Sequence, residues 1–339
     1  MEKKKTINIK KLLSDNSIYV FLVPAILVIE IIEPSFLSIS SIVNIISLTA
    51  ASLPMALGIA GTIILTGTDL SAGRMVGLTA CVSAALLQST DYIGKLFKGI
   101  PTMPIFVALL AALFIGALFG CLNGFFVAKF SIHPFIVTLS TQLVIYGLLL
   151  IFLMIGNNNG QTLSGLAPEY MQFVSGSILS IGETPVPNYV WFAIIITVIM
   201  WVIWNKTAFG KNMFAIGSNA ESARVAGVRV TGTIIGVFVL AGILYGYTGF
   251  IEAARIGSNS ASTGLNYELD AIAACVIGGV SFVGGTGKIK GVVTGVLLLR
   301  IIFVGLMYIG VDSNFQYIIK GAIILTACII DMKKYRVRK

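Results

Sequence analysis

The chain has 339 residues, of which 57% are hydrophobic and only 11% are charged, and its formal net charge is +9. Apolar runs recur with lengths near the ~20 residues that a helix needs to cross a bilayer, which excludes an ordinary soluble domain and predicts an all-α polytopic membrane protein. The basic residues are scattered over short loops and tails without interleaved aromatic residues, so the positive charge does not indicate nucleic-acid binding.

We expect about ten transmembrane helices in one transmembrane domain over residues 18–332, between cytoplasmic tails at 1–17 and 333–339. In chain order, the predicted spans are 18–32, 42–65, 75–88, 104–126, 135–155, 189–204, 233–254, 269–282, 289–309 and 315–330.

Lysine and arginine concentrate on one side of these spans. If the amino terminus lies inside, the outside segments hold only Lys95, Lys98 and Arg255, and the long outside segment 156–188 carries no basic residue. Basic residues resist translocation and stay on the cytoplasmic side of a membrane. Both termini are therefore predicted to be cytoplasmic.

Small residues recur at four-residue spacing within the spans. Gly116, Gly120 and Gly124 lie in the predicted span 104–126, and Gly242 and Gly246 lie in 233–254. This spacing is typical of helices whose backbones approach closely, because lipid gives no hydrophobic drive for helix association. We expect packing within one subunit, with a contact between two subunits as the alternative.

Two segments rich in glycine and hydroxyl groups interrupt the helical pattern at the cytoplasmic ends of spans. They cover residues 66–74 and 278–288, and each joins an inward span to an outward one, as the halves of a weak internal repeat would. Irregular backbone at membrane depth is tolerated only where protein or a water-filled path surrounds it, so both are candidate gates. Alternatively, Asp69 or Ser71 only caps the next helix.

Polar side chains in or beside the spans are candidates for the lining of a translocation path or gate, although each has the alternative of bonding to a neighbouring helix. They are Asn44, Thr66, Thr68, Asp69, Ser71, Asn123, Gln142, Tyr146 and Ser281. Charges within spans cost ~2.5 to 3.5 kcal/mol on insertion scales, so Arg300 and Lys320 need compensation. We expect structural ion pairs there, with a polar lining as the alternative.

Enzymatic chemistry has little support in the sequence. The only histidine is His133, and the four cysteines lie in predicted spans without the spacing of metal ligands. The segment 284–288 resembles a phosphate loop, but Ile289 stands where Ser or Thr should hold magnesium. We expect this chain to bind no metal and no cofactor of its own.

The sizeable polar segment 205–230 lies on the predicted cytoplasmic side. Within it, Glu221, Ala223 and Gly227 have the spacing Glu-x-Ala-x-x-x-Gly. The spacing predicts a short amphipathic helix with a carboxylate near its first turn, where the helix dipole favours negative charge, and a glycine where the chain turns away. Such a helix suits binding by another protein.

This spacing resembles the Glu-Ala-Ala-x-x-x-Gly loop of bacterial ABC importer permeases, which docks on a separate ATPase, with Ser222 in place of the first alanine. The whole chain is similar to the ribose/galactose type of these permeases, and in particular to the galactose/methyl-galactoside group. The segments that carry the resemblance are 67–74, 204–207, 209–212, 267–275 and 316–321.

The resemblance implies a permease that works with three kinds of partner. They are a second permease subunit, expected to be identical, a cytoplasmic ABC ATPase that holds ATP and magnesium, and an extracytoplasmic sugar-binding protein that delivers a monosaccharide. The residues it implies for coupling to the ATPase are Phe209, Gly210, Asn219, Glu221, Ala223 and Gly227. Those predicted to dock the sugar-binding protein at the outer face are Arg255, Glu268 and Asp270.

Three alternatives stay open from the sequence. The substrate is ribose or another pentose or hexose instead of galactose. The chain is a secondary sugar transporter driven by an ion gradient, which predicts carboxylates deep within the bundle, whereas the acidic residues here are expected near span ends and loops. The chain is a membrane scaffold without substrate flux.

Overall fold

The computed structural model describes residues 26–156 and 158–336. Of the predicted span 18–32, the described part is helical over 26–32, and the remainder lies outside the described residues, as does the tail at 1–17. Of the predicted tail at 333–339, residues 333–336 are helical and 337–339 lie outside the described residues. The named helices are α3 (Ile39–Ile64), α4 (Ala72–Leu86), α5 (Ile105–Phe130), α6 (Pro134–Leu153), α7 (Pro168–Ser175), α8 (Asn188–Lys206), α9 (Ala208–Ser218), α10 (Ala220–Val225), α11 (Val230–Ile256), α12 (Tyr267–Ile277), α13 (Ile289–Tyr308) and α14 (Ser313–Arg336).

Six helices of the described residues are long and apolar enough to cross a membrane: α3, α5, α6, α8, α11 and α13. They correspond to six of the predicted spans. Two other predicted spans are short helices, since α4 has 15 residues and α12 has 11. The helical membrane fold is thus confirmed, whereas the number of crossings is not settled by helix length.

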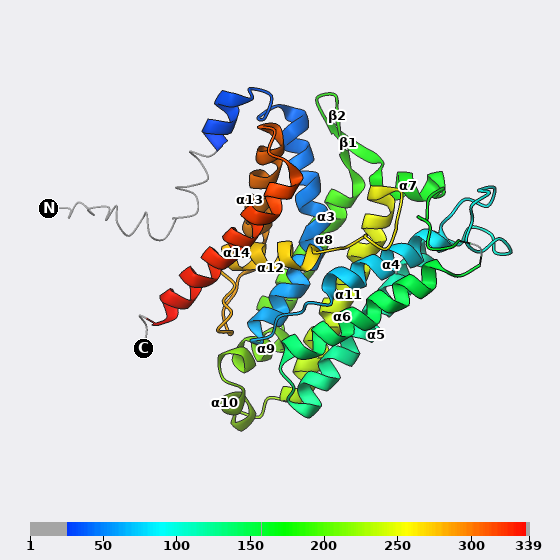
Figure 1. Cartoon of the computed structure of the whole chain (residues 1–339). Coiled ribbons are helices and arrows are strands. Elements are labelled where there is room, and N and C mark those ends of the chain that lie inside the picture. Colours follow the sequence, from blue (N-terminus) through cyan, green and yellow to red (C-terminus); the bar gives the residue numbers. More distant parts are fainter. Residues whose placement is uncertain (1–25, 157, 337–339) are drawn as a thin grey trace.

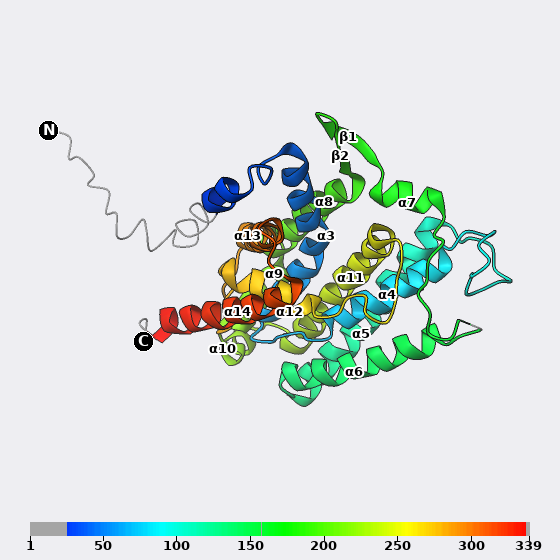
Figure 2. The same cartoon turned by 45° about the horizontal axis from the view of Figure 1, so that its top comes forward.

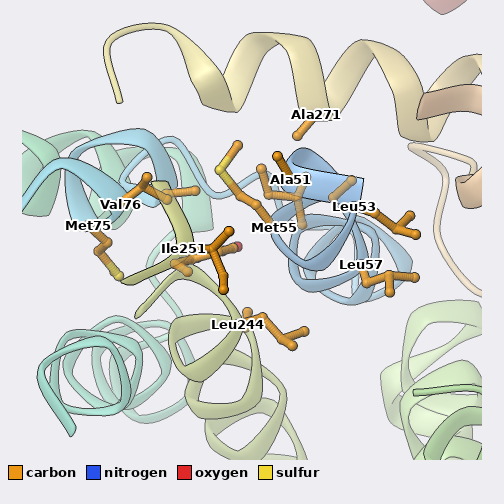
Figure 3. Close-up of a cluster of buried hydrophobic side chains, with 14 of the residues drawn as sticks. Ala51, Leu53, Met55, Leu57, Met75, Val76, Leu244, Ile251 and Ala271 are labelled. Carbon is orange, nitrogen blue, oxygen red and sulfur yellow. The ribbon is translucent and has the colours of Figure 1, made fainter. Parts of the chain in front are cut away.

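The helices form two groups on either side of α3. Figure 2 shows α4, α5, α6 and α11 on one side and α12, α13 and α14 on the other, an arrangement that the view in Figure 1 also shows. Buried side chains of α3, α4, α11 and α12 meet at the centre, where Met55, Met75, Leu244 and Ala271 lie close together (Figure 3). This central contact holds the two groups together.

The turns of the chain gather at two opposite ends of the bundle. At one end, which we call the inner end, the Gly285 amide donates to the Ile64 carbonyl at 2.9 Å, next to α9 and α10. At the other, outer end, short bridges join Gln88 to Leu166. Figure 1 shows α10 and the strand pair at opposite ends. The basic segment 205–230 therefore lies away from the segment 156–188, as the charge distribution predicts.

The outer segment is not entirely irregular. It contains α7 and an antiparallel pair of strands, β1 (Ser177–Ile181) and β2 (Thr184–Pro187), in which Ile181 pairs with Thr184. Gly182 makes the turn between the strands at φ 61°, a conformation that favours glycine. The all-α prediction is correct for the spans and missed this small hairpin.

Glycine allows α5 and α11 to pack backbone against backbone. A Cβ atom on Gly116 would lie 2.0 Å from the Gly242 carbonyl oxygen, and a Cβ on Gly242 would lie equally near the Gly116 oxygen. Gly120 and Gly246 face Phe238 and Ala112 in the same way. The four-residue glycine spacing therefore serves contact within one subunit, as expected.

The segment 257–266 corrects a prediction. The sequence suggested an exposed outer loop, but the chain turns at Gly257 (φ 73°) and runs back into the bundle alongside α4. The Cys81 thiol faces the Ser260 carbonyl at 3.7 Å, and Gly77 allows the Thr263 backbone to approach α4. One side of this irregular backbone packs against α4, where Asn259, Thr263 and Gly264 are buried, whereas Ser258, Ser262 and Leu265 stay exposed. As a result, α12 begins inside the protein.

Candidate functional site

The predicted short helix in the polar segment is present as α10, and each of its ends has a physical cause. Asn219 caps it, since its Oδ1 accepts a hydrogen bond from the Ser222 amide at 2.8 Å. Gly227 ends the turn after it at φ 85°, with no atom within 4 Å of the position a Cβ would take. Thr207 caps the preceding helix α9 by accepting from the Gly210 amide at 3.2 Å.

The free face of α10 differs from the one expected. Ala223 is only 4% exposed and turns toward its own subunit, so it does not form the outer face of the helix. Glu221 and Arg224 are exposed and form an ion pair at 3.2 Å. Val225 is 89% exposed, and it was missed by sequence reasoning although it stands four residues after Glu221, on the same side of a helix. The exposed face thus combines a carboxylate with an apolar side chain.

Phe209 and Gly210 lie behind this face and fix α9 to the bundle. A Cβ on Gly210 would lie 2.3 Å from the Trp204 carbonyl oxygen, so only glycine permits the tight passage from α8 to α9. The Phe209 ring packs over Gly236 of α11, whose missing Cβ leaves room for it. Both residues connect the polar segment to membrane helices and present little surface to a partner.

The two predicted interruptions meet at the inner end. Gly284 packs against Thr66, and both lie next to Gly217 in α9. A Cβ on Gly217 would lie 1.8 Å from the Ile64 carbonyl oxygen and 2.7 Å from the Gly285 amide nitrogen. Through backbone atoms, the segment 205–230 therefore contacts the second interruption and the end of α3, which directly precedes the first interruption.

A buried polar cluster holds the first interruption to α5. Asn123 Nδ2 donates to Ser71 Oγ at 2.9 Å, and Ser71 Oγ donates to Asp69 Oδ1 at 2.6 Å. All three residues are fully buried. The Ser71 side chain makes no capping bond, whereas Asp69 Oδ1 accepts from the Ser71 amide at 3.0 Å. The cluster therefore connects the first interruption to α5. The Ser71 side chain does not cap α4.

The remaining candidates for the path are dispersed. Thr68 is held to α6 because Thr138 Oγ1 donates to its carbonyl at 3.2 Å, and the Tyr146 ring lies 4.1 Å from the Arg74 guanidinium carbon. Gln142 is half-buried on α6, Asn44 is exposed on α3, and Ser281 is buried at the inner end. The candidates thus lie on different helices and at the inner end, and their place in a translocation path stays a prediction.

The structure does contain a cavity of about 80 Å³ between α3, α11, α12 and α13, which we call the polar cavity. Its polar lining consists of Ser52, Thr248, Glu252, Arg255, Tyr267, Asp270 and Arg300. Its apolar wall includes Met55 and Phe303. Arg255 and Tyr267 come from the ends of the stretch between the predicted spans 233–254 and 269–282, which the sequence placed outside the bundle.

Two ion pairs involve residues that line the polar cavity. Arg255 donates to both oxygens of Glu252 at 2.8 and 2.7 Å, and Lys320 Nζ lies 2.5 Å from Asp270 Oδ1. The ion pair expected for Lys320 is therefore present. Arg300 has instead a hydrogen bond from Nε to Ser52 Oγ at 3.2 Å and lines the cavity, which was the alternative.

These contacts do not support docking of a soluble protein by Glu268 and Asp270. Glu268 is 4% exposed and lies against Gly73, while Asp270 is engaged by Lys320. Arg255 keeps 26% of its side chain exposed, and its guanidinium is held by Glu252. The physical reason for the correction is the return of the chain into the bundle after α11, which carries the charges inward. Among the described residues, no group of three or more His, Cys, Asp or Glu is placed to hold a metal ion.

A bundle of long apolar helices, an exposed capped helix at the basic end and backbone contacts from that end to interrupted helices together define a membrane transport permease. The family model described as "Branched-chain amino acid transport system / permease component" matches residues 36–328, and the chain belongs to this family. It is therefore a transport subunit of an ABC importer and a multi-pass protein of the bacterial inner membrane.

Curated relatives match along almost the whole chain. The galactose/methyl galactoside import permease protein MglC of Escherichia coli (strain K12) is 44% identical over 328 residues, which is 96% of each chain. MglC of Haemophilus influenzae is 43% identical over 340 residues, covering 100% of this chain and 99% of the relative. The ribose import permease protein RbsC of Bacillus subtilis is 33% identical over 311 residues, 91% of this chain and 90% of the relative. No solved structure matches.

Proposed function

We propose that this chain is the translocating subunit of an ATP-driven importer of galactose and methyl galactosides. The observation that carries the proposal is the 44% identity with a galactose/methyl galactoside permease over 96% of both chains. Identity with a ribose permease is lower, at 33% over 91% of this chain. Ribose is therefore the alternative substrate, and a competition experiment decides between the two.

The proposed transporter contains further subunits. Two copies of this chain enclose the path, a sugar-binding protein delivers the substrate at the outer end, and a cytoplasmic ATPase holds ATP and magnesium. About ten crossings with both termini in the cytoplasm fit the charge distribution, since the inner end carries most lysine and arginine. The short helix α4 would then be one of these crossings, and α12 would complete another that begins with the segment 257–266.

The proposed coupling is mechanical. The ATPase grips the exposed face of α10 at Glu221 and Val225, and the movement passes through α9 to Gly217. Gly217 abuts the end of α3 and the segment 278–288, so a displacement of α9 moves both interruptions at once. Backbone-to-backbone contact suits this role because it has no flexible side chain that would absorb the movement.

The rival mechanism, transport driven by an ion gradient, has one structural argument in its favour. The sequence suggested acidic residues near span ends and loops, but Asp69, Glu252 and Glu268 are all buried. Carboxylates inside a membrane bundle are what proton or sodium coupling requires. Membership of an ABC permease family supports ATP as the energy source, and the experiment below separates the two mechanisms.

The test is uptake of radiolabelled galactose into proteoliposomes that contain the permease, its ATPase and its sugar-binding protein. We expect uptake to require ATP inside the vesicle and to continue when ionophores collapse all ion gradients. Excess unlabelled methyl galactoside should compete, and excess ribose should not. Competition by ribose and not by methyl galactoside would show that ribose is the substrate. Uptake that needs an ion gradient and no ATP would show that the gradient drives transport.

A further inference from the structure

Arg300 is a cation in the middle of the apolar helix α13 without an ion pair. Its Nε donates to Ser52 Oγ at 3.2 Å. Within residues 26–156 and 158–336, ion pairs within 4 Å are formed by Arg224, Arg255 and Lys320, and Arg300 is not among them. An arginine at the centre of a membrane helix is expensive unless a partner or water compensates it. The terminal nitrogens of Arg300 therefore need acceptors beyond Ser52.

The polar cavity lies directly beside this guanidinium and is not sealed. Arg255 and Asp270 in its lining keep 26% and 19% of their side chains exposed, and Lys320, the partner of Asp270, keeps 17%. Charged groups that open toward lipid hydrocarbon would carry the same penalty as Arg300. The opening therefore faces water or another part of the protein, and the translocation path of a permease offers such a water-filled space.

The chemistry of the cavity suits a neutral molecule with several hydroxyl groups. The pairs Glu252–Arg255 and Asp270–Lys320 each neutralise themselves, yet their oxygens and N–H groups still accept and donate hydrogen bonds. Arg300 adds donors, and Tyr267 and Phe303 add aromatic surface at the same wall. A sugar hydroxyl both donates and accepts, so it can bond to the carboxylates and to the guanidinium, whereas an ionic solute would have to disrupt one of the pairs.

We propose that the polar cavity is a hydroxyl-binding subsite for the transported monosaccharide, with Arg300 donating hydrogen bonds from its terminal nitrogens. The inference rests on the proposed function as a sugar permease. A volume of about 80 Å³ holds a few water molecules, each of which takes ~30 Å³ in liquid, and is too small for a whole sugar ring. The sugar therefore presents one edge of its ring at the opening and displaces these waters.

The first test uses Arg300→Gln and Arg300→Lys in the complete transporter. Lys290→Gln, an exposed cation at the inner end of the same helix, is the matched control. For each protein, uptake of galactose is compared with uptake of a series of monodeoxygalactoses carried by the same sugar-binding protein. The ratio of wild-type to variant uptake then cancels the effect of each analogue on the sugar-binding protein.

For galactose we expect Arg300→Gln to lower uptake about 10-fold to 100-fold, as loss of a hydrogen bond from a charged group does. Arg300→Lys should recover part of this loss, and Lys290→Gln should match wild type. For the one deoxygalactose that lacks the bound hydroxyl, uptake by the wild type and uptake by Arg300→Gln should be nearly equal. The same wild-type to variant ratio for every analogue would overturn the subsite, whereas absence of ATP-dependent uptake in the wild type would overturn the proposed function itself.

The second test measures water access and does not depend on transport. Ser52→Cys is labelled with a charged methanethiosulfonate in a chain whose accessible Cys121 and Cys328 are replaced by serine. We expect labelling from water and slower labelling as galactose is added. Leu143→Cys, on the exposed apolar face of α6, should stay unlabelled because it faces lipid. A Ser52→Cys thiol that is unreactive, or reactive at a rate that galactose does not change, would contradict the inference.

Discussion

Gly217→Ala tests whether α9 transmits movement to the membrane helices through backbone contact. The added Cβ would lie 1.8 Å from the Ile64 carbonyl oxygen, whereas real Cβ atoms keep at least 3.0 Å from other heavy atoms. Neither neighbour is a flexible side-chain tip, so α9 must move away by about 1 Å. Overpacking of this kind costs ~1 to 3 kcal/mol. The hydrogen bond of 2.9 Å from the Gly285 amide to the Ile64 carbonyl would be strained as well.

If this energy destabilises the conformation that couples the ATPase to transport, the population of that conformation decreases ~5-fold to 150-fold. We expect sugar uptake and receptor-stimulated ATP hydrolysis to fall within that range, while the ATPase still co-purifies because the exposed face of α10 is unchanged. The assay is uptake and ATP hydrolysis in the same proteoliposomes. Both rates come from one preparation, so a change in protein amount cannot imitate uncoupling.

Gly232→Ala is the matched control for this prediction. Gly232 also lies at the inner end, in the first turn of α11, but no atom lies within 4 Å of the position of an added Cβ. Alanine there should leave uptake unchanged and add up to ~1 kcal/mol of helix stability. Wild-type uptake in Gly217→Ala would refute transmission through this contact, and equal losses in both variants would indicate a general effect on the inner end.

Three further predictions concern stability and assembly. Gly242→Ala should destabilise the protein by ~1 to 3 kcal/mol through its clash with α5, whereas Gly147→Ala, with no atom within 4 Å, should not; unfolding in mixed detergent and SDS micelles measures both, and equal effects would contradict the packing account. Asn219→Ala should weaken α10 by ~1 kcal/mol and lower ATPase co-purification, with recovery in Asn219→Asp; a loss that Asn219→Asp shares would reject the capping role. Asp270→Asn should cost about 3 kcal/mol because it leaves Lys320 without its partner, and Lys320→Met in the same chain should restore most of the stability; no recovery in the double variant would reject the pair as the cause.

Much of the fold follows from features that are local in the sequence. Six predicted spans correspond to long apolar helices because a run of ~20 apolar residues has few other structures available to it in a membrane. The glycine spacing of α5 and α11 predicted close packing correctly, since small residues at that interval have little other use in lipid. The capped helix α10 and its exit turn at Gly227 were predictable from residue types alone.

The polar cavity was not predictable in this way, because its residues are far apart in the sequence and meet only when the chain returns into the bundle after α11. Segment 257–266 has the polarity and the glycines of an ordinary loop, and only the small residues of α4 reveal a surface on which its turns pack. The return of this segment carries Tyr267 and Asp270 to Arg300, which lies about 30 positions further along the chain. The sequence signal was Arg300 itself, a charge in an apolar span that needed compensation.

Val225 was missed for a different reason. Sequence reasoning treated Ala223 as the contact residue by resemblance, although in a helix of six residues only one face is free and the capping residues decide which one. Once Asn219 and Gly227 fix α10, Ala223 turns inward and Val225 outward. Val225 then lies beside Glu221 on the exposed face of α10, the face that we propose the ATPase contacts.

The most direct test of the account is the position and the partner of residue 225. In inside-out vesicles stripped of the ATPase, Val225→Cys should react with an impermeant maleimide, and rebinding of the ATPase should slow this reaction. The same thiol should not react in right-side-out vesicles of the complete transporter. A cross-linker on the same thiol should join the chain to the ATPase. Labelling from outside the cell, or a cross-link to the sugar-binding protein, would contradict coupling through α10 and with it the proposed mechanism.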